Sequence, residues 1–110
     1  MPDQSGDDAI LVLTSLPDTS SAEKLAEFLI GEQLAACINI LAPCTSIYQW
    51  QGKLEKSNEI PLMIKTTLCH YERLEQAILN HHPYELPEII YVSIEGGLPA
   101  YLAWLAKVNN

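Results

Sequence analysis

The chain has no hydrophobic run long enough to cross a membrane, and it carries little positive charge. No apolar stretch among its 110 residues approaches the length of about 18 that is needed to span a bilayer. Residues 1–8 are polar and acidic, and they lack the basic start and apolar run of a secretory signal peptide. Six Lys and Arg against fourteen Asp and Glu give a formal net charge of −8, which repels nucleic acid and anionic lipid. We therefore expect a cytoplasmic protein with neither nucleic acid nor a membrane as a partner.

Motifs of the common catalytic and redox sites are also missing. The nucleophile-elbow pattern GxSxG does not occur, and Gly96-Gly97 is too short to cradle a phosphate as a P-loop does. Cys37, Cys44 and Cys69 form no CxxC pair, which excludes a zinc ribbon and a thioredoxin-like motif. Three cysteines without a secretory signal are typical of thiols in the reducing cytosol. We expect a protein that is not an enzyme, with three reduced, structural cysteines.

The periodicity of apolar residues predicts one domain at 9–110 after a flexible tail at 1–8. Strands are expected at 9–14, 36–50, 59–68 and 88–95, and helices at 21–33, 70–82 and 100–108. The order strand–helix–strand–strand–helix–strand is typical of the ferredoxin-like α+β fold, with an extra C-terminal helix.

Local signals predict where these elements begin, bend and turn. Ser20 and Glu23 indicate a capping box before the first helix. Pro43 cannot donate a hydrogen bond to a neighbouring strand, so a bend or bulge is expected there. Gln51-Gly52 predicts the turn of an extended hairpin, because glycine adopts positive φ at little cost. The far end of that hairpin has no cover within one chain, which favours pairing with another subunit.

Adjacent histidines, His81 and His82, lie at the end of the second expected helix and directly before Pro83. Proline biases the preceding residue toward extended geometry, so His82 should lie just outside the helix. Imidazole is the commonest metal ligand, and two imidazoles at a helix end can bind Cu(II) or Zn(II). The alternative is that both are cationic side chains that complement the negative end of the helix dipole.

Short motifs in a fixed order resemble the CutA divalent-cation-tolerance family. HPYELPEI at 82–89 is similar to that family's HPYxxPEI. Further matches are LTSLPD, LAACINI, YQWQGKL, KT and YLAWL, beginning at positions 13, 34, 48, 65 and 101. The resemblance extends from about residue 9 to residue 107. It implies a homotrimer of ferredoxin-like subunits that binds divalent metal ions, copper first, and is linked to metal-ion tolerance.

The resemblance also implies a ligand set for copper. Family members with copper-binding assignments use tandem histidines, which correspond to His81 and His82, together with a cysteine at the end of the first strand. Alignment on Pro17-Asp18 places Thr14 at the cysteine position. A threonine hydroxyl is a poor ligand for Cu(I), so the implied site is a modest one for Cu(II), with zinc as the alternative.

A second group of side chains is expected in clefts between subunits: Trp50, Lys53, Glu59, Lys65, Tyr84 and Glu88. These would converge on a small anionic metabolite, which gives a second functional hypothesis, a trimeric signalling or scaffold protein. An analogy with the fold of the trimeric PII proteins is consistent with that hypothesis. Lys65 and Glu59 can instead be a solvated pair, and an acid–base set with Tyr84 lacks any geometry in the sequence.

Overall fold

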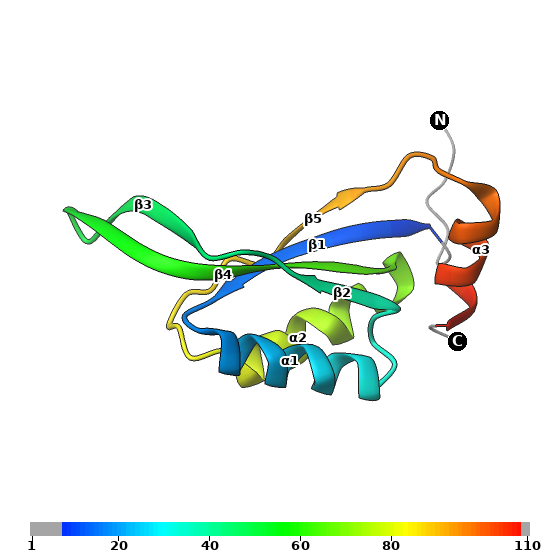
Figure 1. Ribbon diagram of the computed structural model, residues 1–110, viewed down its shortest axis with the longest axis horizontal. Coiled ribbons are helices and arrows are strands. Elements are labelled where there is room, and N and C mark those ends of the chain that lie inside the picture. Colours follow the sequence, from blue (N-terminus) through cyan, green and yellow to red (C-terminus); the bar gives the residue numbers. More distant parts are fainter. Residues whose placement is uncertain (1–7, 109–110) are drawn as a thin grey trace.

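The computed structural model describes residues 8–108, and it shows a mixed α+β fold with an antiparallel sheet and three helices (Figure 1). The tail expected at 1–8 lies, apart from Asp8, outside the described residues. The elements are β1 (Ala9–Leu16), α1 (Thr19–Gly31), β2 (Cys37–Ile40), β3 (Cys44–Trp50), β4 (Lys53–Thr67), the 3-10 turn η1 (Leu68–His70), α2 (Tyr71–His81), β5 (Ile90–Ser93) and α3 (Pro99–Val108). No helix within 8–108 is long and apolar enough to cross a membrane.

The sheet is organised around β4, which pairs antiparallel with three other strands. Strand order is β2-β4-β1-β5, and β3 pairs with the first half of β4 to form a hairpin that extends beyond the sheet (Figure 1). The bend expected at Pro43 is confirmed, because β2 ends at Ile40 and β3 begins at Cys44. The predicted hairpin turn is also confirmed, with φ of 53° at Gln51 and 81° at Gly52.

The core lies between one face of the sheet and helices α1 and α2. Side chains alternate along β1, where Ile10 and Val12 are fully buried. The predicted alternation along β4 is confirmed at positions 60, 62, 64 and 66, all of which are buried. The helices contribute Ala22, Leu25, Leu29, Leu74 and Ile78 to the same core. Burial of these apolar side chains is the main favourable term that holds the helices to the sheet.

The capping box expected at Ser20 and Glu23 is wrong, because the first helix begins earlier. Its N-cap is Asp18, whose backbone is extended and whose Oδ1 accepts a hydrogen bond of 2.7 Å from the Ser21 amide. An Asp directly before Thr19 caps the helix as well as a serine would, so the chain enters α1 two residues sooner. Other ends also differ: β4 begins at Lys53, six residues before the expected start at 59, β5 is limited to Ile90–Ser93, and α2 follows a 3-10 turn.

All three cysteines are free, as expected, but only one of them is a structural residue. Cys37 is half-buried in β2, whereas Cys44 and Cys69 are exposed. The expectation of three structural thiols is therefore wrong for these two exposed positions.

The face of the sheet opposite α1 and α2 is not covered by those helices (Figure 1), and apolar residues of β1 and β5 lie on it. Leu11 pairs with Val92 and Leu13 pairs with Ile90 on this face, which we call the open face. Ile90 and Val92 are each 51% exposed. Helix α3 packs on β1 and β4 at one end only. A contiguous apolar surface of this kind is typical of an interface with another chain.

Candidate functional site

His82 uses both of its ring nitrogens within the chain. Its Nε2 lies 2.7 Å from the carbonyl oxygen of Ser15, and a carbonyl only accepts, so Nε2 carries the proton and donates. Its Nδ1 then accepts a hydrogen bond of 3.1 Å from the Tyr84 amide. The backbone of His82 is extended, as Pro83 predicts, and the ring is turned back onto the end of β1. His82 is therefore a neutral imidazole that joins β1, α2 and the following loop.

His81 presents one nitrogen to its surroundings. It occupies the last turn of α2, where Nδ1 lies 2.8 Å from the carbonyl oxygen of Ala77 and must donate to it. The ring also packs on Phe28 of α1, with 4.2 Å between centroids. The remaining lone pair is on Nε2 of an exposed residue. A carbonyl that receives the other ring proton orients an imidazole and raises its basicity as a metal ligand.

The side chains that were proposed to bind one copper or zinc ion together do not form such a site within a single chain. Ligation by His82 would break a hydrogen bond at whichever nitrogen was used. Thr14 is buried on the helix side of β1, and its Oγ1 has no hydrogen-bond partner among residues 8–108. The described part of the chain contains no group of three or more His, Cys, Asp or Glu side chains that could hold a metal ion.

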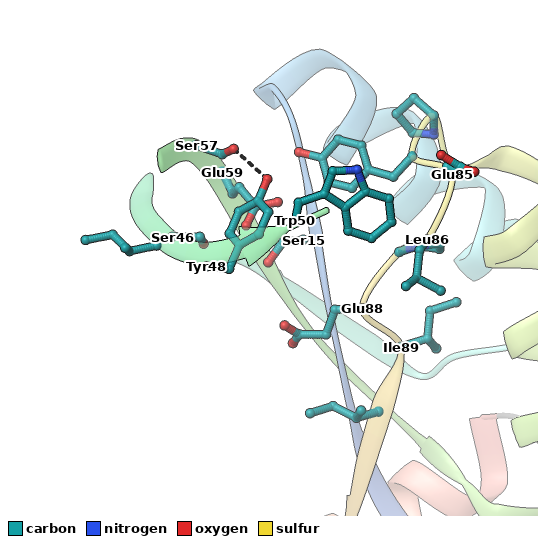
Figure 2. Close-up of a pocket in the computed structure, with 15 residues that line it drawn as sticks. Ser15, Ser46, Tyr48, Trp50, Ser57, Glu59, Glu85, Leu86, Glu88 and Ile89 are labelled. Carbon is teal, nitrogen blue, oxygen red and sulfur yellow. Dashed lines mark hydrogen bonds between the residues drawn. The ribbon is translucent and has the colours of Figure 1, made fainter. Parts of the chain in front are cut away.

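A cavity of about 940 Å³ lies between the β3–β4 hairpin and the segment 83–90 (Figure 2). Four of the six residues expected in a ligand cleft line it: Trp50, Glu59, Tyr84 and Glu88. Figure 2 shows Trp50 between Tyr48 of the hairpin and Leu86 of the facing segment. We call this cavity the hairpin pocket.

The two expected lysines are not among the residues that line the hairpin pocket. Lys53 lies at the hairpin turn, paired with Trp50 in the strand register. Lys65 and Glu59 are six positions apart on β4, a separation of roughly 20 Å along an extended strand. The Lys65 Nζ instead lies 5.8 Å from the centre of the Tyr101 ring in α3. Within one chain, the structure contradicts both the solvated Lys65–Glu59 pair and the acid–base set.

The hairpin pocket is acidic and aromatic. Glu59, Glu85 and Glu88 line it, and its described lining includes no Lys or Arg. Burial raises the pKa of Tyr84 to about 12, and the hydrogen bond to the Glu59 carboxylate and the negative charge of that group act in the same direction. The phenol therefore remains protonated and donates to Glu59. These groups of one chain do not suit the anionic ligand expected from the sequence.

Several polar residues that line the pocket were not expected there, among them Tyr48 and Glu85. Tyr48 is held by a hydrogen bond of 2.9 Å between its hydroxyl and that of Ser57, across the hairpin (Figure 2). It lies two residues before Trp50 on the same strand, so the period of two could have placed both rings on one face. Glu85 had no such signal, because the loop that carries it has no regular period.

The chain is similar to proteins of one family over most of its length. The profile of the CutA1 divalent ion tolerance protein family matches residues 10–108. The divalent-cation tolerance protein CutA of Citrobacter koseri is 40% identical over 98 residues, which cover 89% of this chain and 85% of the relative. Its counterpart in Yersinia pestis is 43% identical over 97 residues, 88% of this chain and 82% of the relative.

Solved structures agree with the sequence comparisons. The crystal structure of CutA from Xylella fastidiosa has a TM-score of 0.91 at 41% identity, and the match covers 94% of this chain and 99% of that one. CutA1 from Oryza sativa has a TM-score of 0.89 at 36% identity, with 92% and 93% covered. The matched region thus includes the sheet, the helices and both candidate sites.

Proposed function

Because the chain belongs to the CutA1 divalent ion tolerance protein family, we propose that it acts in metal-ion tolerance by binding divalent cations. Copper is the first candidate and zinc the alternative. The observation that carries this proposal is the geometry of His81, whose Nδ1 donates to Ala77 and whose Nε2 lone pair is left for a cation. A cytoplasmic location, the lack of catalysis, and the lack of nucleic-acid or membrane partners stay predictions from the sequence.

Metal binding through His81 is expected to be modest in affinity. One nitrogen occupies one coordination position, and water or another ligand must fill the rest. His82 contributes to the position of the helix end rather than to the ion, because its two nitrogens are already hydrogen-bonded. Acidification should weaken binding, since protonated imidazole cannot ligate.

Calorimetric titration with Cu(II) and with Zn(II) tests this proposal. His81→Ala should abolish the measured binding, whereas His82→Gln should retain it in protein that circular dichroism shows to be folded. Equal affinity of the native protein and His81→Ala would place the metal elsewhere and overturn the assignment. Loss of binding in folded His82→Gln with retention in His81→Ala would do the same.

We also propose that the fold is ferredoxin-like and that three copies associate. The element order and the strand order β2-β4-β1-β5 support the fold. The open face and the hairpin support the association, because both leave apolar or unpaired surface at the edge of the chain. An obligate interface typically buries about 2,000 Å² or more.

Sedimentation at micromolar concentration tests the trimer. Val92→Lys places a charge on the open face and should dissociate the assembly. Leu79→Lys is the matched control, because Leu79 is 44% exposed on α2, away from that face. A native protein that sediments as a monomer would refute the trimer.

A second candidate function is a signalling or scaffold trimer that binds a small metabolite in the hairpin pocket. Three carboxylates beside the Tyr48 and Trp50 rings favour an organic cation such as a primary or quaternary amine. The chain has two tryptophans, so Trp104→Phe leaves Trp50 as the only indole to report on the pocket. Spermidine and choline should change the fluorescence of that variant, and the change should disappear in a Glu88→Gln background.

A further inference from the structure

A thiol, an imidazole and a hydroxyl meet where β4 passes into α2, away from both candidate sites described above. The Sγ of Cys69 lies 3.3 Å from Nδ1 of His70. The Oγ1 of Thr67 lies 2.8 Å from the same nitrogen and 3.5 Å from the same sulfur. The three side chains therefore form a closed triangle of hydrogen-bonding contacts.

The three members of this triangle differ in exposure. His70 is 8% exposed and Thr67 is 1% exposed, so both are held by the surrounding structure. Cys69 is exposed. Both Cys69 and His70 belong to the 3-10 turn η1, in which His70 is the buried residue. The imidazole is thus a fixed base beside an accessible sulfur.

We propose that Cys69 is a reactive thiol, activated by His70, and a site of modification by low-molecular-mass disulfides. Thiolate is the nucleophilic form of cysteine, and an adjacent imidazole favours it by taking the proton. The proposal does not depend on metal binding or on the hairpin pocket.

The reaction is a thiol–disulfide exchange that conserves electrons. The Cys69 proton passes to Nδ1 of His70, and the sulfur attacks one sulfur of the disulfide. A new S–S bond forms to Cys69 while the original S–S bond breaks, and the departing thiolate takes the proton from His70. The products are a mixed disulfide on the protein and one free small thiol.

Thr67 can hydrogen-bond with both protonation states of the pair. While the imidazole is neutral, the Thr67 hydroxyl can donate to Nδ1. Once Nδ1 carries the proton, it donates to Thr67 Oγ1, and the hydroxyl hydrogen is free to turn toward the sulfur. Proton transfer therefore requires only rotation of one hydroxyl, and no backbone movement.

Cys44 provides an internal control within the same chain. It is also exposed. Among the residues that the structure describes, its side chain makes a polar contact with the Ser46 hydroxyl alone, at 3.9 Å, and a hydroxyl cannot act as a base near neutral pH. Cys37 is half-buried in β2 and should react more slowly than either exposed thiol. Exposure alone would make Cys44 and Cys69 similar, so a difference between them measures the effect of His70.

The test is the rate at which each cysteine forms a mixed disulfide with glutathione disulfide, measured peptide by peptide by mass spectrometry. Cys69 should react about three to ten times faster than Cys44, because the His70 imidazole is placed to take the thiol proton as the sulfur attacks. His70→Gln should reduce the Cys69 rate to that of Cys44. A Cys44 rate equal to or above that of Cys69 in the native protein would overturn the proposal.

The test stays decisive if His70→Gln does not fold, because the native comparison needs no variant at the buried position. Cys69→Ser and Cys44→Ser change exposed residues only. Total thiol consumption should lose its fast phase in Cys69→Ser and keep it in Cys44→Ser. A fast phase that survives in Cys69→Ser, or an unchanged Cys69 rate in folded His70→Gln, would refute activation by His70.

Discussion

His82 is hydrogen-bonded to Ser15, with 2.7 Å between Nε2 and the carbonyl oxygen, although 67 positions separate the two residues. This bond joins the end of α2 to the end of β1 and orients the loop that lines the hairpin pocket. It also explains why the two adjacent histidines have different roles. His82 joins two elements through its hydrogen bonds, whereas His81 is an imidazole on the surface.

Replacement of His82 should therefore cost stability, while replacement of its neighbour should not. His82→Ala removes the bond to Ser15 and leaves the Tyr84 amide without its acceptor, so the free energy of unfolding should fall by about 1–3 kcal/mol. His81→Ala, at an exposed position, should change it by less than about 1 kcal/mol. Urea unfolding followed by circular dichroism measures both, and equal effects would contradict the structural role of His82.

Two buried threonines on the helix side of the sheet should respond in opposite ways to the same substitution. The Oγ1 of Thr66 donates a bond of 2.8 Å to the Leu34 carbonyl, so Thr66→Val should destabilise the protein by about 1–2 kcal/mol. Thr14→Val removes a buried hydroxyl that has no partner among residues 8–108, so it should be neutral or stabilising by up to about 1 kcal/mol. Chemical denaturation of the two variants side by side gives the comparison. A clear loss in Thr14→Val would show that the hydroxyl has a partner in the assembled protein.

The first helix should depend on Asp18 and not on Ser20. The hydrogen bond from the Ser21 backbone amide, followed by the one from its side chain, lowers the pKa of the Asp18 carboxyl below its ordinary value of 3.8. A lowered pKa in the folded state means that this contribution is present above pH 3.8 and is lost as the pH falls below it. Asp18→Ala should lower the midpoint of thermal unfolding by a few degrees at pH 7, and by less at pH 3. Ser20→Ala is the control and should change the midpoint little at either pH.

Tyr71 and Tyr84 should ionise above the ordinary pKa of a tyrosine, which is 10.0. Burial, followed by hydrogen bonds to Glu75 and Glu59 respectively, raises the pKa of Tyr71 and Tyr84 to about 12. Because both values are raised on folding, the associated stability is complete below pH 10 and decreases between pH 10 and pH 12. Ultraviolet absorbance of tyrosinate should show a late phase that shrinks in Tyr84→Phe and in Tyr71→Phe. A single phase near pH 10 for all five tyrosines would refute these shifts.

Local rules predicted most of the fold. The alternation along β4, the break at Pro43 and the turn at Gln51-Gly52 each depend on neighbouring residues only, and the structure confirms all three. The predicted N-cap of α1 was wrong, because aspartate and serine are both favourable N-cap residues. The sequence alone does not show whether Asp18 or Ser20 takes that position.

The candidate site was harder to predict because its contacts are distant in the sequence. Nothing near His82 indicates that its ring would bond to a β1 carbonyl, so its availability for metal was overestimated. The grouping of Lys65 with Glu59 failed for a geometric reason, since both lie on one extended strand and cannot meet within a chain. Trp50, Tyr84 and Glu88 line one pocket of a single chain, between the hairpin and the loop that follows α2, whereas they were expected in a cleft between subunits.

The pairing of β4 with three other strands has a consequence for the order of folding. Its first half pairs with β3 across a two-residue turn, a contact that forms in microseconds in an isolated hairpin. Its second half pairs with β1, in a register that joins Ala9 to Thr67 and Leu16 to Ile60, so α1, β2 and the hairpin must all lie within the closed loop. Contacts between such distant segments slow folding, because loop closure costs entropy before any pairing compensates for it. The hairpin should therefore be native-like early, and the β1–β4 pairing should set the rate at which the whole domain reaches its folded state.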